Sequence, residues 1–355
     1  MLAVTAGPAR ADGLPVPVPV PAPAALPAAT QALADALFTD PATRETRAVV
    51  VLQDGKPVYE RFAPGYGPAT RLISWSMAKS ITSTLIGMLV ADGKLKLDAP
   101  APVPEWRGDA RAKITLRQLL HMASGLKHDE AGPQPEHSDT NRALFADLSA
   151  DVYKAAVAEP AEVPPGTRFQ YNTLTTHILA RIAADAIAPG ATPDMRKRAV
   201  RDFLLRRLAG PAGMTSLLCE FDPAGNLYGG SLCHATARDW AAFGQLYLDG
   251  GRVAGRQIVS PEWVRFVVTP SPTNPGYGGQ FWLNRRPASG KDEALFWHAG
   301  PADAFAAIGH LGQYVIIVPS KRLVVVRLGK TQDDRLQPVR DALARLVNAF
   351  PAVTK

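Results

Sequence analysis

The chain has 355 residues, enough for one large domain or two smaller ones with a substantial core. Lys and Arg outnumber Asp and Glu by 39 to 32, a formal net charge of +7, but the basic residues are scattered and form no stripe with interleaved aromatic residues. This pattern argues against nucleic-acid binding. No apolar run reaches the roughly 18 residues that a membrane-spanning helix needs, so we expect no stable insertion into a membrane.

Residues 1–30 are predicted to be a Pro/Ala-rich leader or linker. The segment "MLAVTAGPARADG" contains Ala9-Arg10-Ala11, which fits the small-residue cleavage site of a secretory signal. The proline-rich stretch that follows favours extended chain without a core of its own. We expect a periplasmic or secreted protein, or a cytoplasmic one if the leader is only an Ala/Pro-rich tail.

The first half of the chain begins with a predicted hairpin and two helices. Residues 47–64 alternate a β-branched run, an Asp-Gly turn and a second strand. A helix then follows from Ser76, with an apolar spacing that predicts a buried face and with Gly93 placed as its C-cap. Thr115 is the predicted N-cap of the next helix.

Residues 115–230 are predicted to be mainly helical, with a long loop at 127–142 and helices around 141–158 and 174–188. The length of that loop suggests a lid over substrate. Cys219 and Cys233 flank two short predicted strands and could lie opposite each other, so a disulfide and two buried thiols both remain open.

The C-terminal part contains two clear strands, 313–318 and 323–328, and an amphipathic helix in 333–350. Strands at both ends of the chain and helices between them predict an α+β fold, an antiparallel sheet flanked by helices. We expect residues 31–114 and 231–355 to form the sheet domain and 115–230 a mainly helical subdomain. A cleft between the two would be the natural ligand site.

Chemistry is concentrated in "SWSMAKS", where Ser76 and Lys79 stand three positions apart at the start of an apolar helix. This spacing places both side chains on one face of the helix. Burial and the positive end of the helix both disfavour an ammonium, so Lys79 could be neutral and act as a base on the Ser76 hydroxyl. Tyr171, which follows a predicted turn, could relay a proton to a leaving group.

Six segments in the same order resemble the serine β-lactamase-like hydrolases related to class C β-lactamases. They are "DGKPVYERF", "WSMAKSITSTLIGMLVADGKLKLD", "ITLRQLLHMASGL", "PPGTRFQYNT", "GGSLCHATARDWAAFGQLYLDGG" and "GHLGQYVIIVPSKRLVVVRLG". The family includes DD-peptidases, family VIII esterases and 6-aminohexanoate-dimer hydrolase, and the motifs look closest to the last branch. The resemblance implies the β-lactamase/transpeptidase-like fold, Ser76 as acylated nucleophile, Lys79 as its partner and Tyr171 as the tyrosine of the family's Y-x-N motif.

Two positions depart from the family pattern. Thr173 stands where the Y-x-N motif has asparagine; its side chain is shorter, and one hydroxyl replaces the separate C=O acceptor and NH₂ donors of an amide. The Lys-Thr-Gly motif is absent, and either His298-Ala299-Gly300 or the strand around Ala306 takes its place. With no lysine there for a β-lactam carboxylate, hydrolysis of small esters or amides is favoured over that of penicillin.

The candidate substrate-binding residues are Thr173, Ala306, His310, His298 and Trp282. Each histidine could instead be a structural turn residue, and Trp282 could belong to the core. We expect a serine hydrolase that forms an acyl-enzyme with a small ester or amide and needs no cofactor or metal. The alternatives are a β-lactamase or DD-peptidase-like enzyme, an acyl transferase, and a non-catalytic binding homologue.

Overall fold

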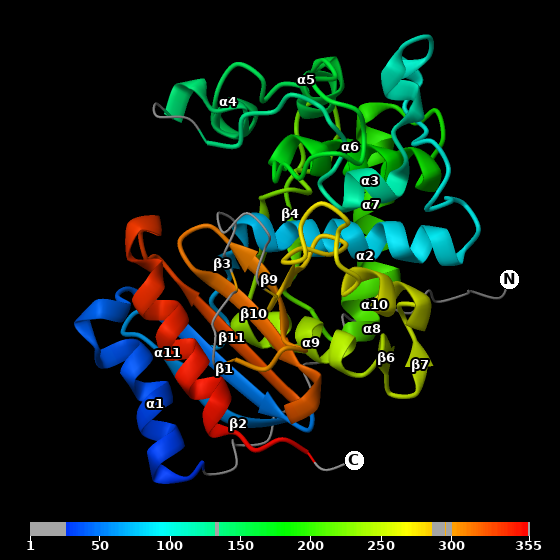
Figure 1. Cartoon of the computed structure of the whole chain (residues 1–355). Coiled ribbons are helices and arrows are strands. Elements are labelled where there is room, and N and C mark those ends of the chain that lie inside the picture. The colour runs from blue at the N-terminus through cyan, green and yellow to red at the C-terminus, as the bar shows by residue number, and fades with distance from the viewer. Residues whose placement is uncertain (1–25, 132–134, 286–294, 296–299, 354–355) are drawn as a thin grey trace, which may run out of the picture.

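The computed structural model describes residues 26–131, 135–285, 295 and 300–353. Its centre is a six-stranded antiparallel sheet with the strand order β2-β1-β11-β10-β9-β8 (Figure 1). The strands are β1 Thr46–Gln53, β2 Lys56–Phe62, β8 Trp282–Leu283, β9 Phe305–Gly309, β10 Gln313–Val318 and β11 Leu323–Gly329. The N-terminal and C-terminal strands therefore form one sheet, and the predicted α+β fold is confirmed.

The predicted hairpins form because their turn residues suit the backbone they must adopt. Asp54 and Gly55, between β1 and β2, have φ of +50° and +73°. These values are those of a two-residue hairpin turn in which both central residues are left-handed. The two C-terminal strands, β10 and β11, are likewise antiparallel neighbours in the sheet.

Helices cover both faces of the sheet, which explains why its central strands are apolar throughout. Helices α1 (Ala28–Thr39) and α11 (Leu336–Ala349) lie on one face, and α9 (Ala237–Leu248) lies on the other (Figure 1). Alternate residues of β10 separate accordingly: Val315 belongs to the core cluster that contains α9, and Ile316 to the cluster that contains α11.

The remaining helices lie mainly between β3 and β8 in the sequence. They are α2 Ala78–Ala91, α3 Leu116–Leu120, α4 Asp139–Phe145, α5 Val152–Ala158, α6 Thr173–Ile187, α7 Pro193–Phe203, α8 Gly210–Ala212 and α10 Pro261–Val267. Small strands β3 Leu72–Ile73, β4 Leu218–Cys219 and β5 Cys233–Ala235 form a second sheet, and β6 Arg252–Val253 pairs with β7 Arg256–Gln257. The division of the chain into a sheet domain and a helical subdomain remains a prediction.

Helix α2 is the central element of the site, because it is buried along most of its length. Every residue from 78 to 89 is buried, which is typical of a helix packed on all sides. A 3₁₀ turn, Trp75–Met77, leads directly into it. Asp92 is its C-cap, and Gly93, the predicted C-cap, is the next residue and has the left-handed φ of +72° that ends many helices. Across the described residues, no helix combines the length and hydrophobicity needed to cross a bilayer.

Candidate active site

Ser76 and Lys79 meet at the start of α2, as their spacing predicts. The Lys79 Nζ lies 3.1 Å from the Ser76 Oγ. The serine is partly exposed on the 3₁₀ turn, whereas the lysine side chain is only 1% exposed. The pair therefore combines a nucleophile open to solvent with an amine removed from it.

The amine of Lys79 has two further partners from other parts of the chain. Its Nζ lies 2.8 Å from the Thr173 Oγ1 and 3.0 Å from the Gly230 carbonyl oxygen. Burial lowers the pKa of Lys79 to about 8, and the nearby Glu130 carboxylate opposes that shift. A substantial fraction of this amine is therefore neutral near pH 8 and able to accept a proton.

Tyr171 completes the group at the residue before the N-cap of α6. The Lys79 Nζ lies 4.8 Å from the centre of its ring, and the Ser76 side chain acts on the phenol by lowering its pKa. Burial, with the charge of Glu130, raises the pKa of Tyr171. The phenol therefore keeps its proton at neutral pH and can donate it.

Glu130 is the site residue that the sequence did not reveal. Its Oε1 accepts a hydrogen bond from the Thr173 Oγ1 at 2.8 Å, and its Oε2 accepts one from the Thr173 backbone N–H at 2.5 Å. Thr140 donates a third hydrogen bond to Oε2 at 2.6 Å. The loop that length alone suggested as a lid thus brings a carboxylate to the first turn of α6, where negative charge is favourable.

Two adjacent glycines let the chain approach Lys79 closely. A Cβ on Gly230 would lie 2.6 Å from the Thr173 Cγ2, and one on Gly229 would lie 2.4 Å from the Thr82 Oγ1. Without side chains, these residues bring their carbonyls to α2, where Thr82 donates to the Gly229 oxygen at 2.9 Å. The Gly-Gly pair was the available sequence signal for this contact.

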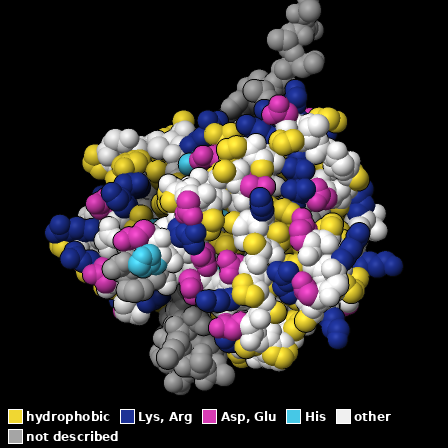
Figure 2. All heavy atoms as spheres, turned by 90° about the horizontal axis from the view of Figure 1, so that it is seen from above, with side chains coloured by type: hydrophobic (Ala, Val, Ile, Leu, Met, Phe, Trp, Pro, Cys, Tyr) yellow, Lys and Arg dark blue, Asp and Glu magenta, His cyan; other side chains and the backbone are white. Residues whose placement is uncertain are grey.

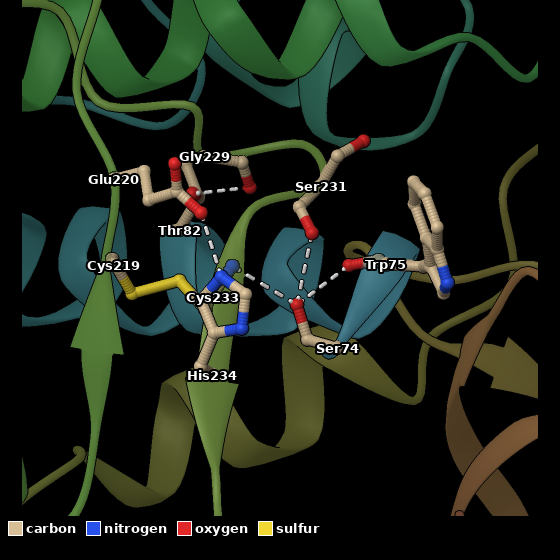
Figure 3. The surroundings of a disulfide bond; sticks show 9 residues. All are labelled: Ser74, Trp75, Thr82, Cys219, Glu220, Gly229, Ser231, Cys233 and His234. Carbon is tan, nitrogen blue, oxygen red and sulfur yellow. Dashed lines mark hydrogen bonds and ion pairs between the residues drawn. A yellow bond between two sulfur atoms is a disulfide. The ribbon is translucent and has the colours of Figure 1, made fainter. Parts of the chain in front are cut away.

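A disulfide lies at the end of the same segment, where it joins β4 to β5 (Figure 3). Cys219 and Cys233 are bonded across β4 and β5, so the disulfide alternative is the one observed. Beside it, Ser74 donates to the Ser231 carbonyl at 3.0 Å and accepts from the Cys233 N–H at 3.2 Å. These bonds connect the disulfide to the turn that carries Ser76.

The end of β9 forms the opposite side of the site. A Cβ on Gly309 would lie 2.1 Å from the Ser74 carbonyl oxygen, so the strand end contacts the chain just before Ser76. Just before β9, the Asn284 N–H donates to the Ala304 carbonyl oxygen at 2.9 Å, and within β9 Ala306 is paired with Trp282. Backbone N–H groups two residues apart in a strand point to the same side. The N–H of Ile308 therefore points to the side of β9 on which β8 lies, at a position beyond the end of β8.

The other candidate substrate-binding residues differ in how far they are buried. Trp282 is buried, with its ring 5.2 Å from that of Tyr171, and therefore supports the site from the core side. Ala306 is fully buried and paired on both sides, with Ile316 and Trp282. His310 is exposed, and its ring lies 5.4 Å from that of Trp75.

His298 lies outside the described residues, so its candidate role stays a prediction.

Trp75, whose ring contacts that of His310, has φ +46°. Such a backbone angle is uncommon for a residue other than glycine and is found preferentially at functional sites. It directly precedes the candidate nucleophile Ser76.

Charged side chains elsewhere on the described surface are mixed in sign. On the face in Figure 2, acidic and basic side chains are interspersed. Among the described residues, no group of three or more His, Cys, Asp or Glu side chains is arranged to hold a metal ion. One apolar pocket lies between residues 201–209 and 217–221, and none of its lining residues belongs to the group around Ser76.

Comparison with known proteins identifies the family and the fold. The Beta-lactamase family model matches residues 34–349. The chain is 26% identical over 302 residues to 6-aminohexanoate-dimer hydrolase from Paenarthrobacter ureafaciens, covering 81% of this chain and 73% of the relative. The fold matches a putative 6-aminohexanoate-dimer hydrolase from Bacillus anthracis (TM-score 0.69, 23% identity, 90% and 83% of the two chains) and a penicillin-binding protein homologue from Caulobacter crescentus (TM-score 0.67, 18% identity, 91% and 96%).

Proposed function

Since the chain belongs to the Beta-lactamase family, whose members are generally hydrolytic serine enzymes, we propose that it hydrolyses small esters or amides through an acyl-enzyme on Ser76. The observation that supports this most is the contact of the buried Lys79 amine with the partly exposed Ser76 hydroxyl, at 3.1 Å. A serine hydroxyl is a weak nucleophile on its own and needs an adjacent base.

In the acylation step, the neutral Lys79 amine takes the proton of the Ser76 hydroxyl as its oxygen attacks the substrate carbonyl. The carbonyl oxygen becomes negatively charged and is bound by the backbone N–H groups of Ser76 and Ile308. Tyr171 then donates its proton to the departing alcohol or amine, and the phenolate recovers a proton from Lys79. In deacylation, water attacks the acyl-enzyme carbonyl while Lys79 takes its proton, and Tyr171 donates a proton to the departing Ser76 oxygen. The acid is released and the Ser76 hydroxyl is restored.

The absence of positive charge on β9, beside the site, supports one class of substrate. Phe305, Ala306, Ala307, Ile308 and Gly309 form β9, and none of them carries a positive charge. A strand without a cation lacks the partner that would hold a substrate carboxylate at that edge. We therefore favour esters and amides without a carboxylate at that position as substrates.

A panel of p-nitrophenyl esters, linear amides and penicillin tests this proposal. We expect turnover of at least one ester or amide by the wild type, and none by Ser76→Ala. Turnover that Ser76→Ala leaves unchanged would refute the proposal. Penicillin turnover faster than that of every ester and amide would instead assign the chain to the β-lactam-hydrolysing alternative.

We also propose that the protein acts in the periplasm or outside the cell. The Cys219–Cys233 disulfide supports this, because disulfides form and persist mainly in oxidising compartments. Fractionation of expressing cells, with thiol labelling of the recovered protein, provides the test. Recovery in the cytoplasm with both thiols free would contradict it.

A further inference from the structure

We propose that Glu130 is a positioning residue that holds the Thr173 hydroxyl proton away from Lys79, so that the free electron pair of the amine stays directed at Ser76. The inference rests on the proposed function, because it concerns how the base of that reaction is prepared. It begins from the three polar atoms around the Lys79 Nζ.

A neutral amine has two hydrogens and one electron pair for these three atoms. The Gly230 carbonyl oxygen, at 3.0 Å, can only accept a hydrogen bond, so it takes one hydrogen. For the electron pair to reach the Ser76 Oγ at 3.1 Å, the second hydrogen must go to the Thr173 Oγ1 at 2.8 Å. Productive geometry therefore requires Thr173 to accept from Lys79.

The hydroxyl of Thr173 does not have this polarity by itself, since it can donate as readily as accept. If it rotated to donate to Lys79, it would occupy the electron pair needed for Ser76. The Glu130 carboxylate prevents this rotation. A carboxylate can only accept a hydrogen bond, and its Oε1 accepts one from the Thr173 hydroxyl at 2.8 Å. The resulting direction of donation is Lys79 to Thr173 to Glu130.

Glu130 is itself held firmly for this role. The Thr173 N–H at 2.5 Å and the Thr140 hydroxyl at 2.6 Å both donate to its other oxygen. The Ser138 hydroxyl donates to its backbone carbonyl at 2.7 Å, which closes the loop. The family's asparagine offers a carbonyl oxygen that needs no such control, so Glu130 offsets the departure at Thr173.

The charged and titratable groups around Lys79 leave Glu130 as its main charge partner. Burial raises the pKa of Tyr171, and of Tyr277 behind it, so both phenols are neutral. On α6, burial lowers the pKa of His177 to about 3, with smaller contributions from Lys79 and His128. His128 in the loop also has a lowered pKa because of burial, so both imidazoles are neutral near pH 7.

The test compares Glu130→Gln, Thr173→Val and the double variant with the wild type. Glu136→Gln is the matched control, because Glu136 is an exposed carboxylate in the same loop. Two quantities are followed against pH: the rate at which a fluorophosphonate labels Ser76, and the titration of the Lys79 amine by ¹⁵N NMR. Thermal unfolding reports whether each variant folds.

We expect Glu130→Gln to lower the plateau labelling rate on the order of tenfold, as for loss of one charge-assisted hydrogen bond. Its acid limb and the Lys79 midpoint should both move to lower pH, because a negative charge that favours the ammonium is gone. Damage to folding alone would not produce that shift. Glu130→Asp should recover part of the rate, and Glu136→Gln should behave as wild type.

In the Thr173→Val background, Glu130→Gln should cause little further loss of rate, since the hydroxyl it controls is absent. Independent, multiplicative losses would overturn the inference, as would an unchanged rate and limb in Glu130→Gln. If wild-type Ser76 is not labelled at all, the proposed function fails. The NMR titration still decides the role of Glu130 in that case, because an unchanged Lys79 midpoint refutes it without any reference to activity.

Discussion

Replacement of Lys79 by methionine should expose the energetic cost of keeping an amine in the interior. The lysine side chain is only 1% exposed, and burial lowers its pKa to about 8 from the ordinary value of 10.5. The unfolded chain therefore holds this proton more tightly than the folded protein does. Below pH 8 the folded state must bury a charge, and above about pH 10.5 both states are neutral.

The size of the effect follows from this difference in pKa. With values of about 8 folded and 10.5 unfolded, the protonation penalty on folding is about 3.4 kcal/mol at low pH. At pH 10 about 0.8 kcal/mol of it remains, so the wild type should gain about 2.5 kcal/mol relative to Lys79→Met between pH 7 and pH 10. Methionine does not titrate, so the loss of the hydrogen bonds of Lys79 changes the stability by the same amount at each pH. That amount cancels when the values at two pH values are subtracted.

The assay is urea unfolding of both proteins at pH 7, 8, 9 and 10. The stability of the wild type should rise with pH relative to that of Lys79→Met. A difference between the two proteins that does not change with pH would refute the reasoning, because it would mean that Lys79 keeps an ordinary pKa when folded. Lys79→Met should in addition lack hydrolytic activity at every pH.

Three further predictions concern catalysis and the disulfide. Because the reaction needs the neutral Lys79 amine, kcat/KM for a p-nitrophenyl ester should fall about tenfold per pH unit below about pH 8; a profile flat from pH 6 to 8 would contradict this. Tyr171→Phe should lower kcat by roughly 10²–10⁴, more for an alkyl ester than for a nitrophenyl ester whose leaving group needs no proton, and an equal loss for both would argue against a proton donor. Replacing Cys219 and Cys233 by serine should lower the free energy of unfolding in urea by about 3 kcal/mol, since the disulfide closes a loop with a sequence separation of 14. A wild-type urea midpoint that dithiothreitol leaves unchanged would contradict this.

The elements with strong local signals could be predicted from the sequence. The β1–β2 hairpin follows from an Asp-Gly turn between β-branched runs, and α3 follows from Thr115, whose capping box with Gln118 is present. The meeting of Ser76 and Lys79 follows from their positions on one helix face. In each case the residues that decide the geometry are within a few positions of one another.

The partners that come from distant segments could not be predicted in this way. Glu130 reaches Thr173 across 43 residues, from a loop with no periodicity, and only packing of the loop on α6 brings them together. The contact of Gly230 with Lys79 spans 151 residues and depends on the space left by absent side chains. The threonine in place of the motif's asparagine was the one local sign that another polar partner was required.

The most direct test of the account is the intact mass of the protein after brief exposure to a short p-nitrophenyl ester and quenching in acid. The account predicts a gain equal to one acyl group in the wild type, located on the peptide that contains Ser76, and no gain in Ser76→Ala. Release of nitrophenol with the acyl group on another residue, or in equal amount from Ser76→Ala, would contradict it.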